Sequence, residues 1–199
     1  MTTDTRNLNA LLGSRICHDL ISPLGAIDNG LELLSMAGIG QTPELSLIAQ
    51  SVESANARIR FFRVAFGAAP DGQDLSHQDI LAVLGPMWRD SRLTVEWRLH
   101  APCPRSEVKL SFPLLQCFDS AMPWGGSLTV ERREGRWHLD ASADKLKVDP
   151  TLWAGLGETG PQASVTAAEV HFPLAAAAAS ALGRSVRVDL GDQTLSVIA

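Results

Sequence analysis

The sequence predicts two parts with different secondary structure, a helical hairpin followed by an α+β domain. Up to about Gly67, apolar residues recur every three or four positions, which is the spacing of amphipathic helices. Beyond Ser76, short helical stretches alternate with segments whose apolar residues recur every second position, as in half-buried strands. The intervening residues 68–74 have the composition of a linker. We therefore expect one domain over residues 1–70 and a second over 71–199.

The first helix is expected to begin near Asp4 or Thr5, since both are suitable N-caps, and to end at Gly38 and Gly40. Its apolar residues step by four and three, which predicts one helical seam. The members of this seam are Ile16, Leu20, Leu24, Ile27, Leu31 and Leu34.

The second helix is expected to begin at Thr42-Pro43-Glu44, where a capping hydroxyl precedes a proline and an acid suited to the first turn. Its seam alternates by three and four until Gly67 ends the helix. The seam consists of Leu45, Ile48, Val52, Ala55, Ile59, Phe62 and Phe66.

Two long seams joined by a short connection predict an antiparallel helical hairpin. A hairpin alone leaves half of each seam in water, so we expect a second copy of the chain to cover them. The result would be a homodimer with a four-helix bundle. The alternative is that the second half of the chain covers the seams within a monomer.

The second domain is expected to be a sheet with helices on one face. Helices are predicted over residues 76–90, 111–122, 149–156 and 173–182, the second with an earlier start and a bend at Pro113 as an alternative. Strands are predicted over residues 93–99, 127–133, 136–141, 185–190 and 193–198, the last four as hairpins around Glu134-Gly135 and Gly191-Asp192.

Composition excludes several classes of function. The net charge of −5 makes binding to nucleic acid improbable. The three cysteines have no CxxC spacing, which argues against a disulfide framework and against a zinc site. No secretory signal or membrane-length apolar run is evident. A cytoplasmic protein that binds neither membrane nor nucleic acid is expected.

The first helix carries one histidine, His18, which projects about 160° from the centre of the apolar seam. Taken together, the other residues of this outer face are mixed, mostly small and low in charge, so another protein could approach closely. They are Leu11, Ser14, Arg15, Cys17, Ser22, Gly25 and Asn29, with Ile21 at the edge.

An outward histidine next to an acid suits the transfer of a phosphoryl group. A carboxylate that accepts a hydrogen bond from one ring nitrogen leaves the other nitrogen free to attack phosphorus. Asp19 is the candidate for this orienting role, and Ser22 lies one turn along on the same side. His18, Asp19 and Ser22 are the candidate catalytic residues, although from position alone a single helical histidine is more often structural.

The segment from His18 to Ile27, HDLISPLGAI, resembles the H-box of sensor histidine kinases. The hairpin then resembles the dimerisation and phosphotransfer module of those kinases. The second half resembles their ATP-binding domain in element order, including the Gly125-Gly126 step before a strand.

The residues that such kinases use for ATP are missing. The expected helix over residues 114–121 has Gln116 and Asp119 but no Asn to hold magnesium. Residues 140–144 lack the glycines of the Asp-x-Gly-x-Gly turn, and no later GxGxxG loop follows. We therefore expect a degenerate ATPase-like domain without ATP and without a metal of its own.

Residues 14–19, 21–23 and 63–68 also resemble the ChpT-type histidine phosphotransferases of alphaproteobacterial cell-cycle relays. That resemblance implies a homodimer that accepts a phosphoryl group on His18 from the receiver domain of a hybrid histidine kinase. It would pass the group to response-regulator receivers of the CtrA and CpdR kind, with Mg²⁺ held by the receiver. Three other functions stay open: an adaptor that only docks receivers, a phosphatase that uses Ser22, and a residual kinase.

Overall fold

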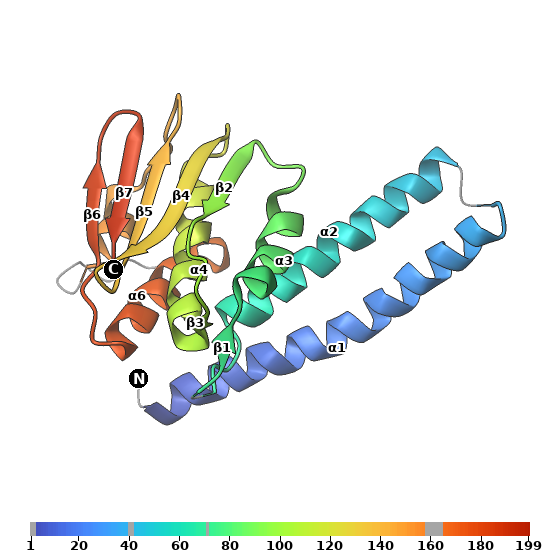
Figure 1. Ribbon diagram of the computed structural model, residues 1–199, viewed down its shortest axis with the longest axis horizontal. Helices are drawn as coiled ribbons and strands as arrows, with labels where there is room; N and C mark the ends of the chain where they lie inside the picture. The colour runs from blue at the N-terminus through green and yellow to red at the C-terminus, as the bar shows by residue number, and fades with distance from the viewer. Residues whose placement is uncertain (1–2, 40–41, 71, 158–164) are drawn as a thin grey trace. The chain divides into compact units, whose positions relative to one another are not determined.

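The computed structural model describes residues 3–39, 42–70, 72–157 and 165–199, with side chains from Ala10 onward (Figure 1). The chain forms two compact units. One comprises residues 1–68 with 82–87, and the other comprises residues 69–81 with 88–199. The helical hairpin and the mixed α/β domain predicted from the sequence are confirmed.

The hairpin consists of α1 (Thr3–Met36) and α2 (Pro43–Ala65), which lie side by side. Gly38 follows α1 with a φ of +77°, a backbone conformation that glycine adopts without strain. The hydroxyl of Thr42 accepts a hydrogen bond from the Leu45 backbone N–H at 3.3 Å, so it caps α2 as predicted.

The apolar seam of α1 is only partly covered within the single chain, where Leu24 and Leu31 are half-buried. Its seam residues Leu20, Ile27 and Leu34 stay 46%, 47% and 37% exposed. On α2, Ile48 is 46% exposed, whereas Val52 and Val64 are buried. Burial of such side chains stabilises a protein by about 1.5–3 kcal/mol each, so this exposed seam is a strong candidate for association.

The α+β unit contains a five-stranded sheet of order β2-β4-β5-β7-β6. β2 runs parallel to β4, and the remaining neighbours are antiparallel. The strands are β2 (Leu93–Trp97), β4 (Gly126–Arg133), β5 (Arg136–Ser142), β6 (Arg187–Leu190) and β7 (Thr194–Ile198). The turn of the β4–β5 hairpin has φ values of +50° at Glu134 and +78° at Gly135, as a two-residue type I′ turn requires.

Alternation along the strands separates a buried face of the sheet from a solvent-exposed one. Leu128, Leu139 and Leu195 are at most 1% exposed, and their neighbours along the strands face the other way. The helices of this unit are α4 (Arg105–Ala121), α5 (Pro150–Ala154) and α6 (His171–Ala181), whereas α3 (His77–Trp88) is divided between the two units. α4 packs against α6.

Several element bounds differ from the sequence prediction. α4 begins at Arg105, six residues before the predicted start at Ser111, and continues through Pro113. Proline costs about 3 kcal/mol inside a helix, but Leu110, Leu114 and other residues of this segment are fully buried. Burial therefore outweighs the proline. The sequence analysis also missed the short strands β1 (Asp74–Leu75) and β3 (Cys103–Pro104) and the 3-10 helix η1 (Ala167–Glu169).

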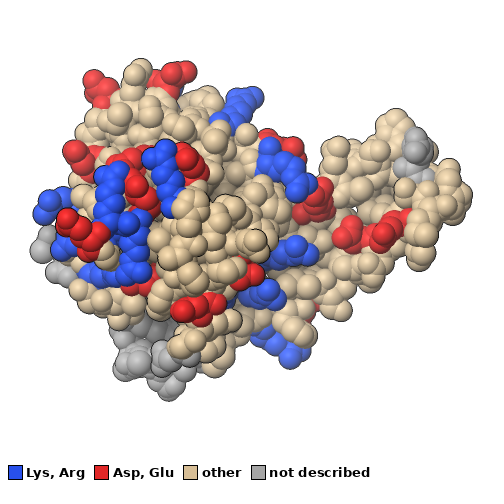
Figure 2. All heavy atoms as spheres, viewed as in Figure 1, with Lys and Arg blue, Asp and Glu red and all other residues tan. Residues whose placement is uncertain are grey.

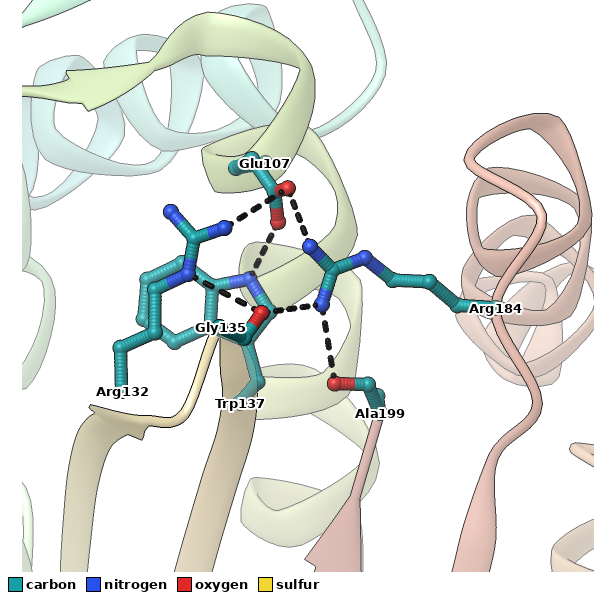
Figure 3. A network of polar contacts seen from close by, with 6 residues as sticks. All are labelled: Glu107, Arg132, Gly135, Trp137, Arg184 and Ala199. Atoms are coloured by element: carbon teal, nitrogen blue, oxygen red, sulfur yellow. Dashed lines mark hydrogen bonds and ion pairs between the residues drawn. The ribbon is translucent and has the colours of Figure 1, made fainter.

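A buried carboxylate at the start of α4 connects distant parts of this unit (Figure 3). Glu107, only 8% exposed, pairs with the guanidinium groups of Arg132 and Arg184. Its second oxygen accepts a hydrogen bond from the indole N–H of Trp137 at 3.0 Å. The Glu107 carboxylate thus binds two guanidinium groups and one neutral hydrogen-bond donor.

The same network fixes the C-terminal strand. Arg184 donates to the backbone oxygen of Gly135 at 2.8 Å and to that of Ala199 at 3.2 Å. Ala199 also exchanges two backbone hydrogen bonds with Trp137. The network therefore joins α4, the β4–β5 hairpin, the segment after α6 and the end of β7.

We predict that Glu107→Gln lowers the free energy of unfolding of this unit by about 2–3 kcal/mol, because two guanidinium groups would lose their counter-charge. Denaturant unfolding followed by tryptophan fluorescence measures this, because all five tryptophans lie between residues 88 and 153, within the α+β unit.

The matched control is Glu96→Gln, which removes a carboxylate that pairs with Arg98 on the surface at 2.7 Å. Exposed pairs contribute less than about 1 kcal/mol. Equal, small losses in both variants would contradict a stabilising role for the buried network.

Candidate functional site

His18 lies in the N-terminal half of α1, and its side chain is 81% exposed. The helical backbone fixes the position of the His18 Cβ atom, and the exposure of the side chain leaves the ring accessible to a partner. The position agrees with the outward projection that the helical periodicity predicts.

Asp19 contacts His18 directly. Its Oδ1 lies 3.2 Å from His18 Nδ1, and its Oδ2 accepts a hydrogen bond from Arg15 Nε at 2.8 Å. The hydrogen bond to His18, followed by the one to Arg15, lowers the pKa of the Asp19 carboxyl below its usual value. Asp19 is therefore ionised near neutral pH, as an acceptor for the imidazole must be.

This contact favours one tautomer of the neutral ring. A proton on Nδ1 allows the imidazole to donate to the carboxylate, and it leaves the lone pair of Nε2 free. The arrangement presents a nucleophilic nitrogen on the outside of α1. Ser22, the third candidate, lies one turn further on and is exposed.

The predicted partner-binding residues fall into three groups by exposure. Leu11, Arg15 and Asn29 are exposed, with 52% for Leu11. Ser14, Ile21 and Gly25 are half-buried. Cys17 is the exception, since it is 7% exposed and does not lie on the accessible face. Contact of these residues with a partner remains a prediction.

The burial of Cys17 follows from its position about 100° around the helix from His18. Burial raises the pKa of its thiol, and the charge of Arg63 on α2 opposes the rise. Cys17 therefore packs within the hairpin next to the exposed histidine. The outer face predicted for α1 correctly included His18 but wrongly included Cys17.

Sequence reasoning missed a joint between the two helices close to His18. The backbone N–H of Ala68 donates to the Ser14 hydroxyl at 3.0 Å. A Cβ on Gly67 would lie 2.4 Å from the Arg63 carbonyl oxygen and 3.0 Å from the Ser14 hydroxyl. The only signal in the sequence is the glycine after the second seam, which predicts a helix end but no partner.

Within the described ranges, no group of three or more His, Cys, Asp or Glu side chains is arranged to hold a metal ion. Over the same part of the chain, no helix is both long and apolar enough to span a membrane.

Comparison with known proteins gives three findings. Residues 77–194 match the model of a protein family described as the histidine phosphotransferase C-terminal domain. The chain is 36% identical over 178 residues to the protein phosphotransferase ChpT of Brucella abortus (strain 2308), covering 86% of this chain and 84% of that protein. A solved structure of a bacterial phosphotransferase superposes with a TM-score of 0.70 at 27% identity, covering 100% of this chain and 97% of that one.

We predict that Gly67→Ala destabilises the hairpin by about 1–3 kcal/mol, because the added methyl group would overlap the Arg63 carbonyl. Faster amide hydrogen exchange in peptides from residues 10–20 and 60–68 would show this.

Gly25→Ala is the control, because a Cβ there meets nothing within 4 Å. Alanine in mid-helix is favoured by about 1 kcal/mol over glycine, so exchange should be unchanged or slower. Equal exchange in both variants would show that the close approach at Gly67 is not needed.

Proposed function

The chain belongs to the histidine phosphotransferase family, and from this premise we propose that His18 is the residue that carries the phosphoryl group. The family function is phosphoryl transfer in a phosphorelay. The observation that carries the assignment to His18 is its exposed ring, whose Nδ1 lies 3.2 Å from the Asp19 carboxylate.

The proposed reaction is a direct transfer between side chains. The lone pair of His18 Nε2 attacks the phosphorus of an aspartyl phosphate on a receiver domain. The N–P bond forms, the acyl P–O bond breaks, and the receiver's carboxylate leaves with the electron pair. The second transfer is the reverse of this step, with the carboxylate of another receiver as nucleophile.

Asp19 has two roles in this proposal. It holds the Nδ1 proton, so that Nε2 is the nitrogen that reacts. Once Nε2 carries phosphorus the ring becomes cationic, and the adjacent carboxylate stabilises that charge. We propose that Ser22, exposed one turn away on α1, contacts the transferred group or the receiver.

The receiver would dock on the exposed face of α1 that includes Leu11, Arg15 and Asn29. We propose that the donor is the receiver domain of a hybrid histidine kinase and that the acceptors are CtrA- and CpdR-like response regulators in a cytoplasmic cell-cycle relay. The receiver would supply Mg²⁺ from its own acidic pocket, and no ATP would be used.

We further propose that the chain acts as a homodimer whose hairpins pair into a four-helix bundle. The exposed seam residues Leu20, Ile27 and Leu34 support this association. Five acidic residues and no Lys or Arg lie between Arg15 and Arg58, so burial of the apolar seam, and not charge, favours the association. On the face seen in Figure 2, the far end of the hairpin shows acidic and uncharged residues but no Lys or Arg.

We predict that incubation with a phosphorylated receiver domain labels the wild-type chain with acid-labile, base-stable phosphate. His18→Ala should abolish the label, because no other residue of this face offers an imidazole. His138→Ala, which changes a histidine of the α+β unit, should be labelled like the wild type.

Binding of the receiver without labelling would favour the adaptor function and contradict the proposal. Labelling by ATP and Mg²⁺ alone would indicate a kinase. Release of inorganic phosphate from the receiver without a labelled intermediate would indicate a phosphatase.

Light scattering should give a mass twice the 21.3 kDa of one chain. Ile27→Glu should produce monomers, because a carboxylate would enter the buried seam of the bundle. Leu33→Glu is the control, since Leu33 is 67% exposed and projects about 140° from the seam centre. A wild-type monomer at all concentrations would contradict the bundle.

A further inference from the structure

We propose that Arg15 is a positioning residue for phosphoryl transfer, because it holds the Asp19 carboxylate where that group can accept the hydrogen bond from His18 Nδ1. This inference rests on the proposed function, in which His18 is the phosphoryl acceptor. It gives Arg15 a task within the chain, in contrast to the direct contact with a partner that the sequence predicts.

The geometry of the helix favours the Arg15–Asp19 pair over the His18–Asp19 contact. Residues at i and i+1 do not face each other, so the His18–Asp19 contact is not favoured by helical spacing alone. Residues at i and i+4 do face each other, and side chains in a helix lean toward its N-terminus. The side chain of Asp19 therefore leans toward Arg15, and their pair at 2.8 Å fixes the position of the carboxylate.

The two carboxylate oxygens of Asp19 have different partners. Oδ2 accepts from Arg15 Nε, and Oδ1 is left to contact His18 Nδ1. The two donors thus do not compete for one oxygen. The His18 contact measures 3.2 Å, at the long end of the range for N–H···O hydrogen bonds. A small rotation of the carboxylate would break it, so its orientation needs support from the other side.

α1 has few cations. After Arg6, Arg15 is the only Lys or Arg before Arg58, so it is the one Lys or Arg on the rest of α1. Because Asp19 is held by that single cation on its own helix, loss of Arg15 cannot be compensated from within α1.

Exposure limits the size of the effect. The Arg15 and Asp19 side chains are 74% and 49% exposed, and water screens such pairs strongly. A docked receiver would exclude water and strengthen the pair. We therefore expect Arg15→Ala to slow transfer roughly three- to tenfold, which is the range between an exposed pair and a charge-assisted hydrogen bond.

A double-mutant cycle in the full chain separates positioning from direct contact. Single-turnover transfer from a phosphorylated receiver is measured for the wild type, Arg15→Ala, Asp19→Asn and the double variant. If Arg15 acts through Asp19, its removal slows the wild type but causes no further loss in the Asp19→Asn background. The loss should fall on the maximal rate and leave the receiver concentration at half-maximal rate unchanged.

A spectroscopic measurement tests the same idea without phosphoryl transfer. The ring ¹⁵N signals of His18, assigned with His18→Ala, report how the proton is divided between Nδ1 and Nε2. Arg15→Ala should lower the share on Nδ1, and Arg15→Lys should restore part of it because the positive charge remains.

Three results would decide the matter. Equal losses from Arg15→Ala in both backgrounds would overturn the proposal and indicate that Arg15 contacts the receiver. An unchanged tautomer ratio in Arg15→Ala would overturn it as well. Failure of the wild type to take label on His18 would instead contradict the proposed function, and the ¹⁵N signals would still show whether Arg15 orients the ring.

Discussion

The hydrogen bond between His18 and Asp19 is the interaction on which the candidate site depends. An imidazole in water exchanges its proton between both nitrogens, and only a fixed partner at one of them reserves the other for chemistry. The surrounding structure holds Asp19 in the position needed for this hydrogen bond. α1 supplies a rigid base, Arg15 and Asp19 lie one turn apart, and the joint at Ser14 and Ala68 fixes α1 against the end of α2.

The two units meet different physical demands. The α+β unit has a sheet face covered by helices and a buried carboxylate, Glu107, that is neutralised within the unit. The hairpin has an apolar seam that stays partly exposed in the single chain. Its stability is therefore expected to depend on association, which fits a module that presents the reactive residue to other proteins.

Local patterns predicted most of the fold because they depend on neighbours in sequence. The cap at Thr42, the turn at Glu134-Gly135 and the seam of α1 all follow from spacing and residue type. Contacts over long separations could not be predicted. Glu107 and Arg184 are 77 residues apart, and Ser14 and Ala68 are 54 apart. For the site, periodicity placed His18 correctly but missed that Cys17 is buried and that Arg15 binds Asp19.

The 81% exposure of the His18 side chain affects the lifetime of a phosphorylated form of this residue. A phosphoryl group on this nitrogen would be largely exposed to water, with little protein around it to slow hydrolysis. The proposed intermediate would therefore have a lifetime set by its own chemistry, and signal would be lost whenever the next receiver is scarce. The phosphorylation level of such a carrier would follow the present phosphorylation of its donor and would not persist after the donor loses its phosphoryl group.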